Sequence, residues 1–202
     1  LSPEEKQRIA SVYSDSSALL QMTGVPQLYG EAGYSLLERT GARPTLDVNG
    51  LYSGFIGEGS KTIIPAYAKA KISCRLVPDQ DPVHVLRCIR RHLAKLCPPS
   101  VRLELKERSH AEPYLVSPTG PQAQAALRAL KLAFGREPVL VREGGSIPIV
   151  NDFKKILRAD ALLLGLSLPD DNAHSPNEKF DLGCFAKGQL MSAHLWQELS
   201  RV

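Results

Sequence analysis

The sequence has 202 residues, with 25 Lys and Arg against 21 Asp and Glu, a formal net charge of +4, and 43% hydrophobic residues. This composition is typical of a globular protein and excludes a disordered or fibrous chain. The charges form no run of one sign and the longest apolar stretch, residues 161–168, is too short to span a bilayer, so we expect neither nucleic acid nor membrane as a partner.

Four cysteines bear on the compartment of the protein. Cys74, Cys88, Cys97 and Cys184 show neither the paired spacing of a metal site nor the density of a disulfide framework. Unpaired thiols are typical of a reducing compartment, so the sequence predicts a cytoplasmic protein.

Residues 1–42 are predicted to be a helical connector. Ser2 can cap a helix that has Pro3 at its first position, so a helix is expected over residues 2–13. Further helical turns are expected over residues 18–22 and 31–39. Linker helices without any chemistry are the favoured interpretation.

Residues 43–115 change to a strand, strand, helix, strand pattern. Apolar and polar residues alternate over residues 68–77, which predicts a strand with one buried face and one basic face that carries Arg75. Asp81 and Pro82 begin a helix, and residues 101–105 alternate again as a strand. The expected structure is a small α+β layer.

Residues 116–202 alternate helix and strand. Helices are expected around residues 127–134, 149–157 and 185–199, with short buried strands at 139–141 and 161–166. Such alternation predicts a mostly parallel sheet, so this segment resembles the C-terminal part of a larger α/β domain.

Two loops carry candidate chemistry. Gly144, Gly145 and Ser146 precede a helix, where free amide groups favour an anion such as a substrate carboxylate or an oxyanion. From the residues alone, a Ser-capped helix after a tight turn is the favoured explanation. His174 lies in a polar loop after a predicted strand, where α/β sheets bind ligands, although a single loop histidine is more often a surface residue.

Three motifs resemble one known family. Residues 169–179 (PDDNAHSPNEK) look like the last metal-ligand loop of the co-catalytic zinc exopeptidases, the superfamily of carnosine dipeptidase, acetylornithine deacetylase and succinyl-diaminopimelate desuccinylase. Residues 142–148 (REGGSIP) are similar to its Gly-Gly-Ser loop. Residues 57–65 (GEGSKTIIP) and 72–78 (ISCRLVP) resemble its lid domain, most of all in the dipeptidase branch.

The resemblance implies a fold and a division of the chain. Residues 43–115 would form a ferredoxin-like lid or dimerisation domain, incomplete because its first strand and helix would lie before Leu1, and residues 116–202 the C-terminal part of the catalytic domain. The N-terminal half, in which the family carries its His-x-Asp motif, bridging Asp and Glu-Glu pair, is not found in this sequence. We therefore expect a fragment that is inactive alone, with the general base elsewhere.

The resemblance also assigns site residues. His174 would bind one of two zinc ions, with other divalent metals such as manganese as substitutes, and Asp171 and Glu178 would be hydrogen-bonding residues around it. Thr62, Arg75, Gly145 and Ser146 would contact a dipeptide or acyl-amino-acid substrate. The expected activity is that of a zinc metallodipeptidase, working as a homodimer through the lid.

Two alternatives remain open at this point. The chain could be a dimerisation or lid module that binds no metal and has no activity. It could also be a serine hydrolase that uses Ser146 with His174 and either Asp170 or Asp171, but the loop lacks the second glycine of a nucleophile elbow. His84, His92, His110 and His194 have no clustered partners in the sequence and are assigned no role.

Overall fold

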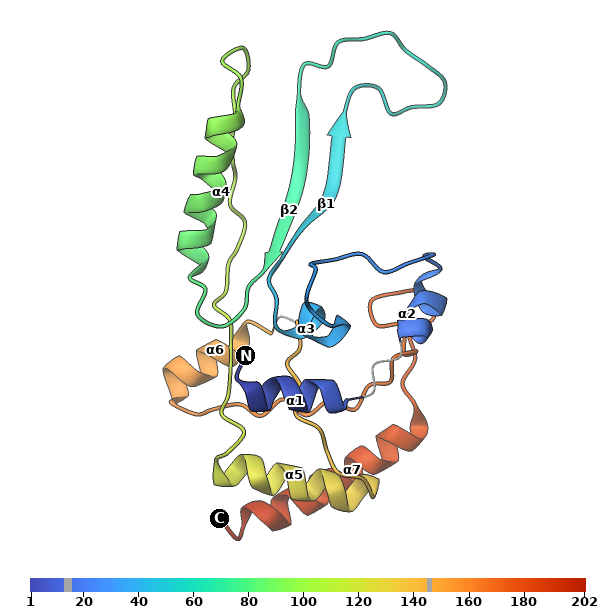
Figure 1. The fold of residues 1–202 in the computed structure, drawn as a ribbon, viewed down its shortest axis with the longest axis vertical. Helices are drawn as coiled ribbons and strands as arrows, with labels where there is room; N and C mark the ends of the chain where they lie inside the picture. Colours follow the sequence, from blue (N-terminus) through green and yellow to red (C-terminus); the bar gives the residue numbers. More distant parts are fainter. Residues whose placement is uncertain (13–15, 145–146) are drawn as a thin grey trace.

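The computed structural model describes residues 1–12, 16–144 and 147–202. Figure 1 shows an elongated molecule, with a β-hairpin and α4 at one end and α5 and α7 side by side at the other. The elements in chain order are α1 (Pro3–Ser11), α2 (Ser16–Thr23), α3 (Leu36–Gly41), β1 (Thr45–Ser53), β2 (Ala68–Arg75), α4 (Pro82–Leu96), α5 (Pro121–Phe134), α6 (Ile149–Asp152), the π-helical turn η1 (Phe153–Leu157) and α7 (Leu182–Leu199).

Helix starts follow the capping residues in the sequence. The side chain of Ser2 accepts the backbone N–H of Glu5 at 3.2 Å, and Asp81 accepts that of Val83 at 2.9 Å. These starts confirm the predicted first helix and α4. The last helix begins three residues earlier than predicted, because Asp181 accepts the N–H of Cys184 at 2.8 Å and caps it there.

The third helix lies later than predicted. Helical turns were expected over residues 31–39, whereas α3 covers Leu36–Gly41. Ser35 accepts the N–H of Glu38, and the Glu38 carboxylate accepts the N–H of Ser35, so a reciprocal capping box fixes the start. The Ser-x-x-Glu spacing that marks this start is visible in the sequence.

The two strands form an antiparallel hairpin. Thr45 pairs with Arg75 at one end and Ser53 with Ala68 at the other, and the register shifts between Val48 and Gly50. The prediction that one face of the second strand is buried was wrong for this chain, since Ile72 is 42% exposed. Among the described residues no third strand joins the ribbon.

Three predicted strands are not formed. Residues 101–105, 139–141 and 161–166 run as chain without strand pairing in the part of the molecule that the structure describes. A strand needs the N–H and C=O groups of a neighbour, and these apolar segments have none beside them. Helix periodicity was a better guide here, because a helix satisfies its backbone within one segment.

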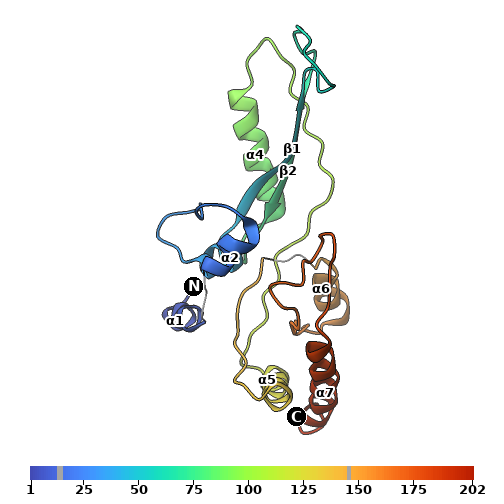
Figure 2. The ribbon, with the colours of Figure 1, turned by 90° about the vertical axis from the view of Figure 1, so that its right-hand side faces the viewer.

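The main core lies between α5 and α7. Alanines on α5 let α7 approach closely, and Leu166 packs so near that a Cβ at Gly188 would lie 2.7 Å from its Cδ1. The buried α5 residues are Ala123, Ala125, Ala126, Ala129 and Ala133. The accessible surface is 15890 Å², whereas a compact monomer of this mass exposes about 9,300 Å². Figure 2 shows the same extended shape from the side.

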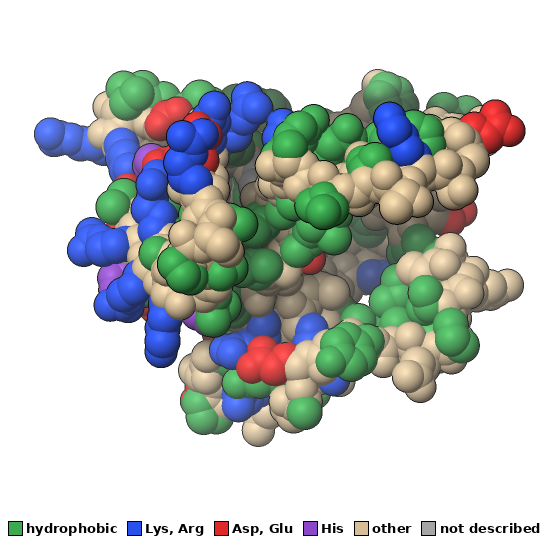
Figure 3. All heavy atoms as spheres, turned by 90° about the horizontal axis from the view of Figure 1, so that it is seen from above, with side chains coloured by type: hydrophobic (Ala, Val, Ile, Leu, Met, Phe, Trp, Pro, Cys, Tyr) green, Lys and Arg blue, Asp and Glu red, His purple; other side chains and the backbone are tan. Residues whose placement is uncertain are grey.

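Surface charge collects on α4. This helix carries Arg87, Arg90, Arg91 and Lys95 and no acidic residue. Figure 3 shows blue side chains gathered on the side of the molecule where α4 lies. No helix among the described residues is long and apolar enough to cross a membrane. The four cysteines are free thiols in the described structure.

Candidate functional site

The segment before the predicted Gly-Gly-Ser loop is packed against the end of α3. A Cβ on Gly41 would collide with the carbonyl oxygen of Arg142, and one on Gly144 would lie 2.5 Å from the carbonyl oxygen of Thr40. Real Cβ atoms do not come so close to a backbone oxygen, so both positions require glycine for this approach. Residues 40–41 and 142–144 thus form a junction that positions the start of the loop.

An ion pair with α1 also holds residue 142 of this junction. Arg142 donates from Nε to Glu5 Oε1 at 2.6 Å and from a terminal nitrogen to Oε2 at 3.0 Å. The hydrogen bonds from Arg142 hold the pKa of the Glu5 carboxyl below its usual value. Gly145 and Ser146, the predicted substrate contacts, lie outside the described residues.

The structure places Arg75 close to this junction along the chain. Arg75 ends β2 and pairs with Thr45, which follows Gly41 by four residues. Four residues span at most about 14 Å. The end of the hairpin that carries Arg75 is thus joined by a short stretch of chain to the end of α3, against which residues 142–144 pack.

Thr62 lies away from Arg75. It belongs to the exposed connection that joins Ser53 to Ala68 at the opposite end of the hairpin. The seven residue steps of β2 separate the two ends by about 23 Å. Within one copy of the chain, Thr62 and Arg75 are not brought together, and Figure 1 shows the connection at the far end from α7.

His174 lies in the loop between residue 168 and the start of α7. Its side chain is exposed and its backbone is left-handed, with φ of 63°. Asp171, three residues earlier, is buried and accepts the N–H of Leu168 through Oδ2 at 2.7 Å. Asp171 thus forms a hydrogen bond within the loop, as expected. Glu178, for which the same role was expected, is exposed.

Lys179 concentrates positive charge at the base of this loop. Its Nζ lies 2.9 Å from Asp170 Oδ2 and 3.6 Å from Asp171 Oδ1. The hydrogen bond from Lys179 lowers the pKa of the Asp170 carboxyl, and in turn raises the pKa of the Lys179 amine. Both groups are therefore charged at neutral pH.

The donor set fits one part of a metal site. Among the described residues no three His, Cys, Asp or Glu side chains come together as a metal site would require. A zinc site takes at least three protein ligands, so His174 is suited to be one ligand of a site whose other donors lie outside these residues. No complete metal centre can be built from the described chain.

Several residues of this region were missed by sequence reasoning. Glu5 and the pair Thr40 and Gly41 contact residues 142–144 from more than 100 residues away. No local spacing signals such contacts. Lys179 was within the recognised motif but had no assigned role, although a basic residue after three acidic ones is a usable signal for an ion pair.

The comparison with protein families gives one match. The family model M20_dimer, described as "Peptidase dimerisation domain", matches residues 4–101. This range includes α1 from its second residue onward, α2 to α4 and both strands.

Relatives with curated descriptions are dipeptidases. The chain is 40% identical over 159 residues to "Cys-Gly metallodipeptidase DUG1" of Saccharomyces cerevisiae. The matched segment covers 75% of this chain and 32% of that protein. It is 28% identical over 207 residues to "Beta-Ala-His dipeptidase" of Rattus norvegicus, covering 100% of this chain and 42% of that protein. The chain thus spans less than half the length of these relatives.

A solved structure gives the corresponding match of folds. The M20 family metallo-carboxypeptidase Sso-CP2 from Sulfolobus solfataricus superposes with a TM-score of 0.84 and 28% sequence identity. The match covers 96% of this chain and 44% of that one. The hairpin region and the C-terminal segment of this chain are therefore arranged as in the matched part of that enzyme.

Proposed function

Because this chain belongs to the family of the M20 peptidase dimerisation domain, we propose that it is part of a metal-dependent dipeptidase. The reaction is hydrolysis of the amide bond in a dipeptide or an N-acylated amino acid. The observation that carries this proposal is the 40% identity to a metallodipeptidase over three quarters of the chain. The mixed fold class predicted from the sequence, an incomplete lid followed by part of a catalytic domain, is confirmed by the structural match.

In this proposal the chain has three parts. Residues 1–42 are a helical connector, residues 43–115 form the lid and residues 116–202 contribute to the catalytic domain. The unpaired segments 139–141 and 161–166 are the edges at which further strands of that domain would add. This arrangement would cover apolar surface that the described chain leaves in water.

The metal site would be completed by donors outside the described residues. His174 supplies one imidazole, and zinc is the proposed metal, two ions per active site, with manganese as a substitute. When bound, such metal ions would polarise the scissile carbonyl and lower the pKa of a bound water toward neutrality. The chain alone is proposed to be inactive, because its described residues offer neither the remaining ligands nor a general base.

Substrate contacts are proposed around the junction at the end of α3. Arg75 has a planar fork of donors that suits a substrate carboxylate. Gly145 and Ser146 would offer amide and hydroxyl groups to the same anion or to an oxyanion. Thr62 is kept as a lid residue that contacts substrate, although it does not share one carboxylate with Arg75 within a single copy.

The other parts of the proposal concern the oligomeric state and the cellular compartment. A homodimer through the lid agrees with the description of the matched domain. Free thiols agree with a cytoplasmic enzyme. A metal-free module and a serine hydrolase are less well supported, since the relatives are described as a metallodipeptidase and a dipeptidase.

A fusion protein tests the function. The 202-residue chain would be joined to the N-terminal half of a close family member, and zinc-dependent dipeptide cleavage would be measured. His174→Ala should abolish activity and lower zinc content, whereas Ser146→Ala should slow turnover without stopping it. Complete loss in Ser146→Ala with full zinc content in His174→Ala would reject the metallopeptidase and support the serine mechanism.

A further inference from the structure

The loop that carries His174 is closed at its start by Asp171. The backbone N–H of Asp171 donates to the carbonyl oxygen of Leu168 at 3.1 Å, and its Oδ2 accepts the N–H of Leu168 at 2.7 Å. The residue is only 5% exposed. A carboxylate is rarely buried to this extent without partners, so its place in the loop is well determined.

Lys179 closes the loop at its other end. Its backbone N–H donates to the carbonyl oxygen of Asp171 at 3.0 Å, while its amine lies beside Asp170 and Asp171. The chain therefore returns to its own beginning after eight residues. His174 lies between these ends, where Ser175 donates its N–H to the carbonyl oxygen of Asn172 at 2.9 Å.

The backbone inside the loop is unusual. Asn172, His174 and Asn177 have φ of 54°, 63° and 60°. Histidine adopts the left-handed region only in a minority of cases, at a cost of order 1 kcal/mol or more. Three such residues within six positions need a fixed frame, and Asp171 with Lys179 is the frame that the described structure offers.

We propose that Asp171 and Lys179 are positioning residues, which hold the loop so that the imidazole of His174 faces outward in one orientation. This inference rests on the proposed function, since the ligand presented is the one that would bind metal. Oδ1 of Asp171 is buried without a hydrogen bond, and the Lys179 amine at 3.6 Å is its nearest described counter-charge. Loss of either side chain therefore leaves the loop closed by its backbone hydrogen bonds alone.

The first test uses the 202-residue chain and amide hydrogen exchange. Asp171→Ala removes the acceptor of the Leu168 N–H, so exchange at that amide should speed by about tenfold, the change expected when an ordinary hydrogen bond is lost. Because the loop then loses its side-chain support, exchange at Lys179 and Ser175 should speed as well. Asp171→Asn keeps an oxygen that can accept from Leu168, so it should exchange at an intermediate rate. Ser175→Ala, which keeps the Asp171 carboxylate and its bond from the Leu168 N–H, is the matched control and should not differ from the parent chain.

The second test uses the fusion protein loaded with cobalt, whose visible absorption reports the geometry of its ligands. Asp171→Ala should change the spectrum and weaken metal binding by roughly 10- to 100-fold, the range typical when residues that orient a metal ligand are removed. Asp171→Asn should restore part of the affinity. Ser175→Ala and Glu198→Gln, the latter a substitution in α7 far along the chain, should leave the spectrum unchanged.

The outcomes separate this inference from the proposed function. If His174→Ala binds cobalt as tightly as the parent fusion, the metal proposal itself is wrong. If His174→Ala loses the metal but Asp171→Ala keeps the parental spectrum and affinity, the positioning role is wrong and the function stands. A spectral change in Ser175→Ala as large as that in Asp171→Ala would also overturn the inference.

Discussion

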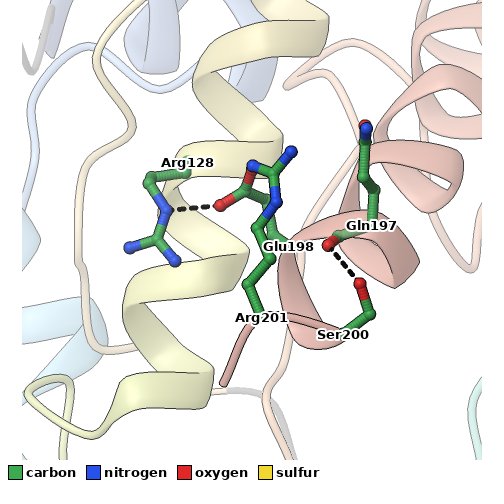
Figure 4. A network of polar contacts seen from close by, with 5 residues as sticks. All are labelled: Arg128, Gln197, Glu198, Ser200 and Arg201. Carbon is green, nitrogen blue, oxygen red and sulfur yellow. Dashed lines mark hydrogen bonds and ion pairs between the residues drawn. The ribbon is translucent and has the colours of Figure 1, made fainter.

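Glu198 of α7 is held between two arginines, and the closest contact is the 2.6 Å hydrogen bond from Arg128 Nε of α5 to its Oε2. Arg201 donates to the other oxygen at 2.7 Å, and Glu198 is 6% exposed although both arginines are largely in water. Figure 4 shows this network, with Ser200 closing the helix end on the carbonyl oxygen of Gln197. The pair joins the two helices of the main core.

Glu198→Gln should lower the thermal midpoint at neutral pH. The hydrogen bond from Arg128 holds the pKa of Glu198 below its usual value in the folded chain. A lowered carboxyl pKa stabilises the fold above the unfolded pKa of about 4.3, and this contribution is lost as the pH falls through the folded pKa. The difference between the two proteins should therefore shrink below that pH. Thermal unfolding of both proteins, followed at a series of pH values from about 7 to about 3, measures this difference.

A surface ion pair provides the control for that experiment. Glu112 and Lys155 form a pair in which both side chains are more than half exposed. Glu112→Gln should barely change the midpoint at any pH, because exposed pairs contribute little. Equal effects of the two substitutions would contradict the role assigned to Glu198.

Gly41→Ala should destabilise the chain by about 1–3 kcal/mol, since the new methyl would overlap the carbonyl oxygen of Arg142. Urea unfolding gives the value. Gly165→Ala is the matched control, because no atom lies within 4 Å of its added Cβ. If both variants unfold alike, the packing of α3 against residues 142–144 is not as described.

The purified 202-residue chain should hold no stoichiometric zinc. His174 is the only ligand proposed in it, and one imidazole does not retain zinc against water. Elemental analysis after dialysis at neutral pH measures the content. A value near one zinc per chain would show that a full ligand set exists within the chain and would contradict the proposed division.

The chain should self-associate through its hairpin. Both outer edges of the ribbon lack strand partners among the described residues, and Leu51 on β1 is 80% exposed. Leu51→Lys should reduce association in light scattering. Leu182→Lys, an equally exposed position outside the hairpin, should have a smaller effect, and a clean monomer of the parent chain at micromolar concentration and above would refute the prediction.

Arg75→Ala in the fusion protein should keep the metal but weaken binding of substrates with a free carboxylate by roughly 1.5–3 kcal/mol, the value of a charge-assisted hydrogen bond. Inhibition constants for dipeptides and their C-terminal amides measure the effect. The amides should lose little affinity. Arg87→Ala on α4 is the control, and a similar loss for amides would show that Arg75 does not bind the carboxylate.

The sequence alone determined the features whose cause is local. Ser2, Asp81 and Asp181 begin helices because their side chains accept N–H groups within three residues, and Gly135 ends α5 with φ of 66°. The motifs around Thr62, Arg75 and His174 were enough to predict the family and the fold class, because each is a short contiguous string.

Tertiary structure decided what depends on distant partners. Residues 101–105, 139–141 and 161–166 have strand-like patterns but no neighbouring strand in the described chain, so pattern alone could not decide their pairing. It also decided that residues 142–144 pack against residues 40–41, a few residues before the strand partner of Arg75, while Thr62 lies beyond the other end of the hairpin, about 23 Å of strand away. Such proximities arise from backbone contacts between segments far apart in sequence, which no local pattern of side chains encodes.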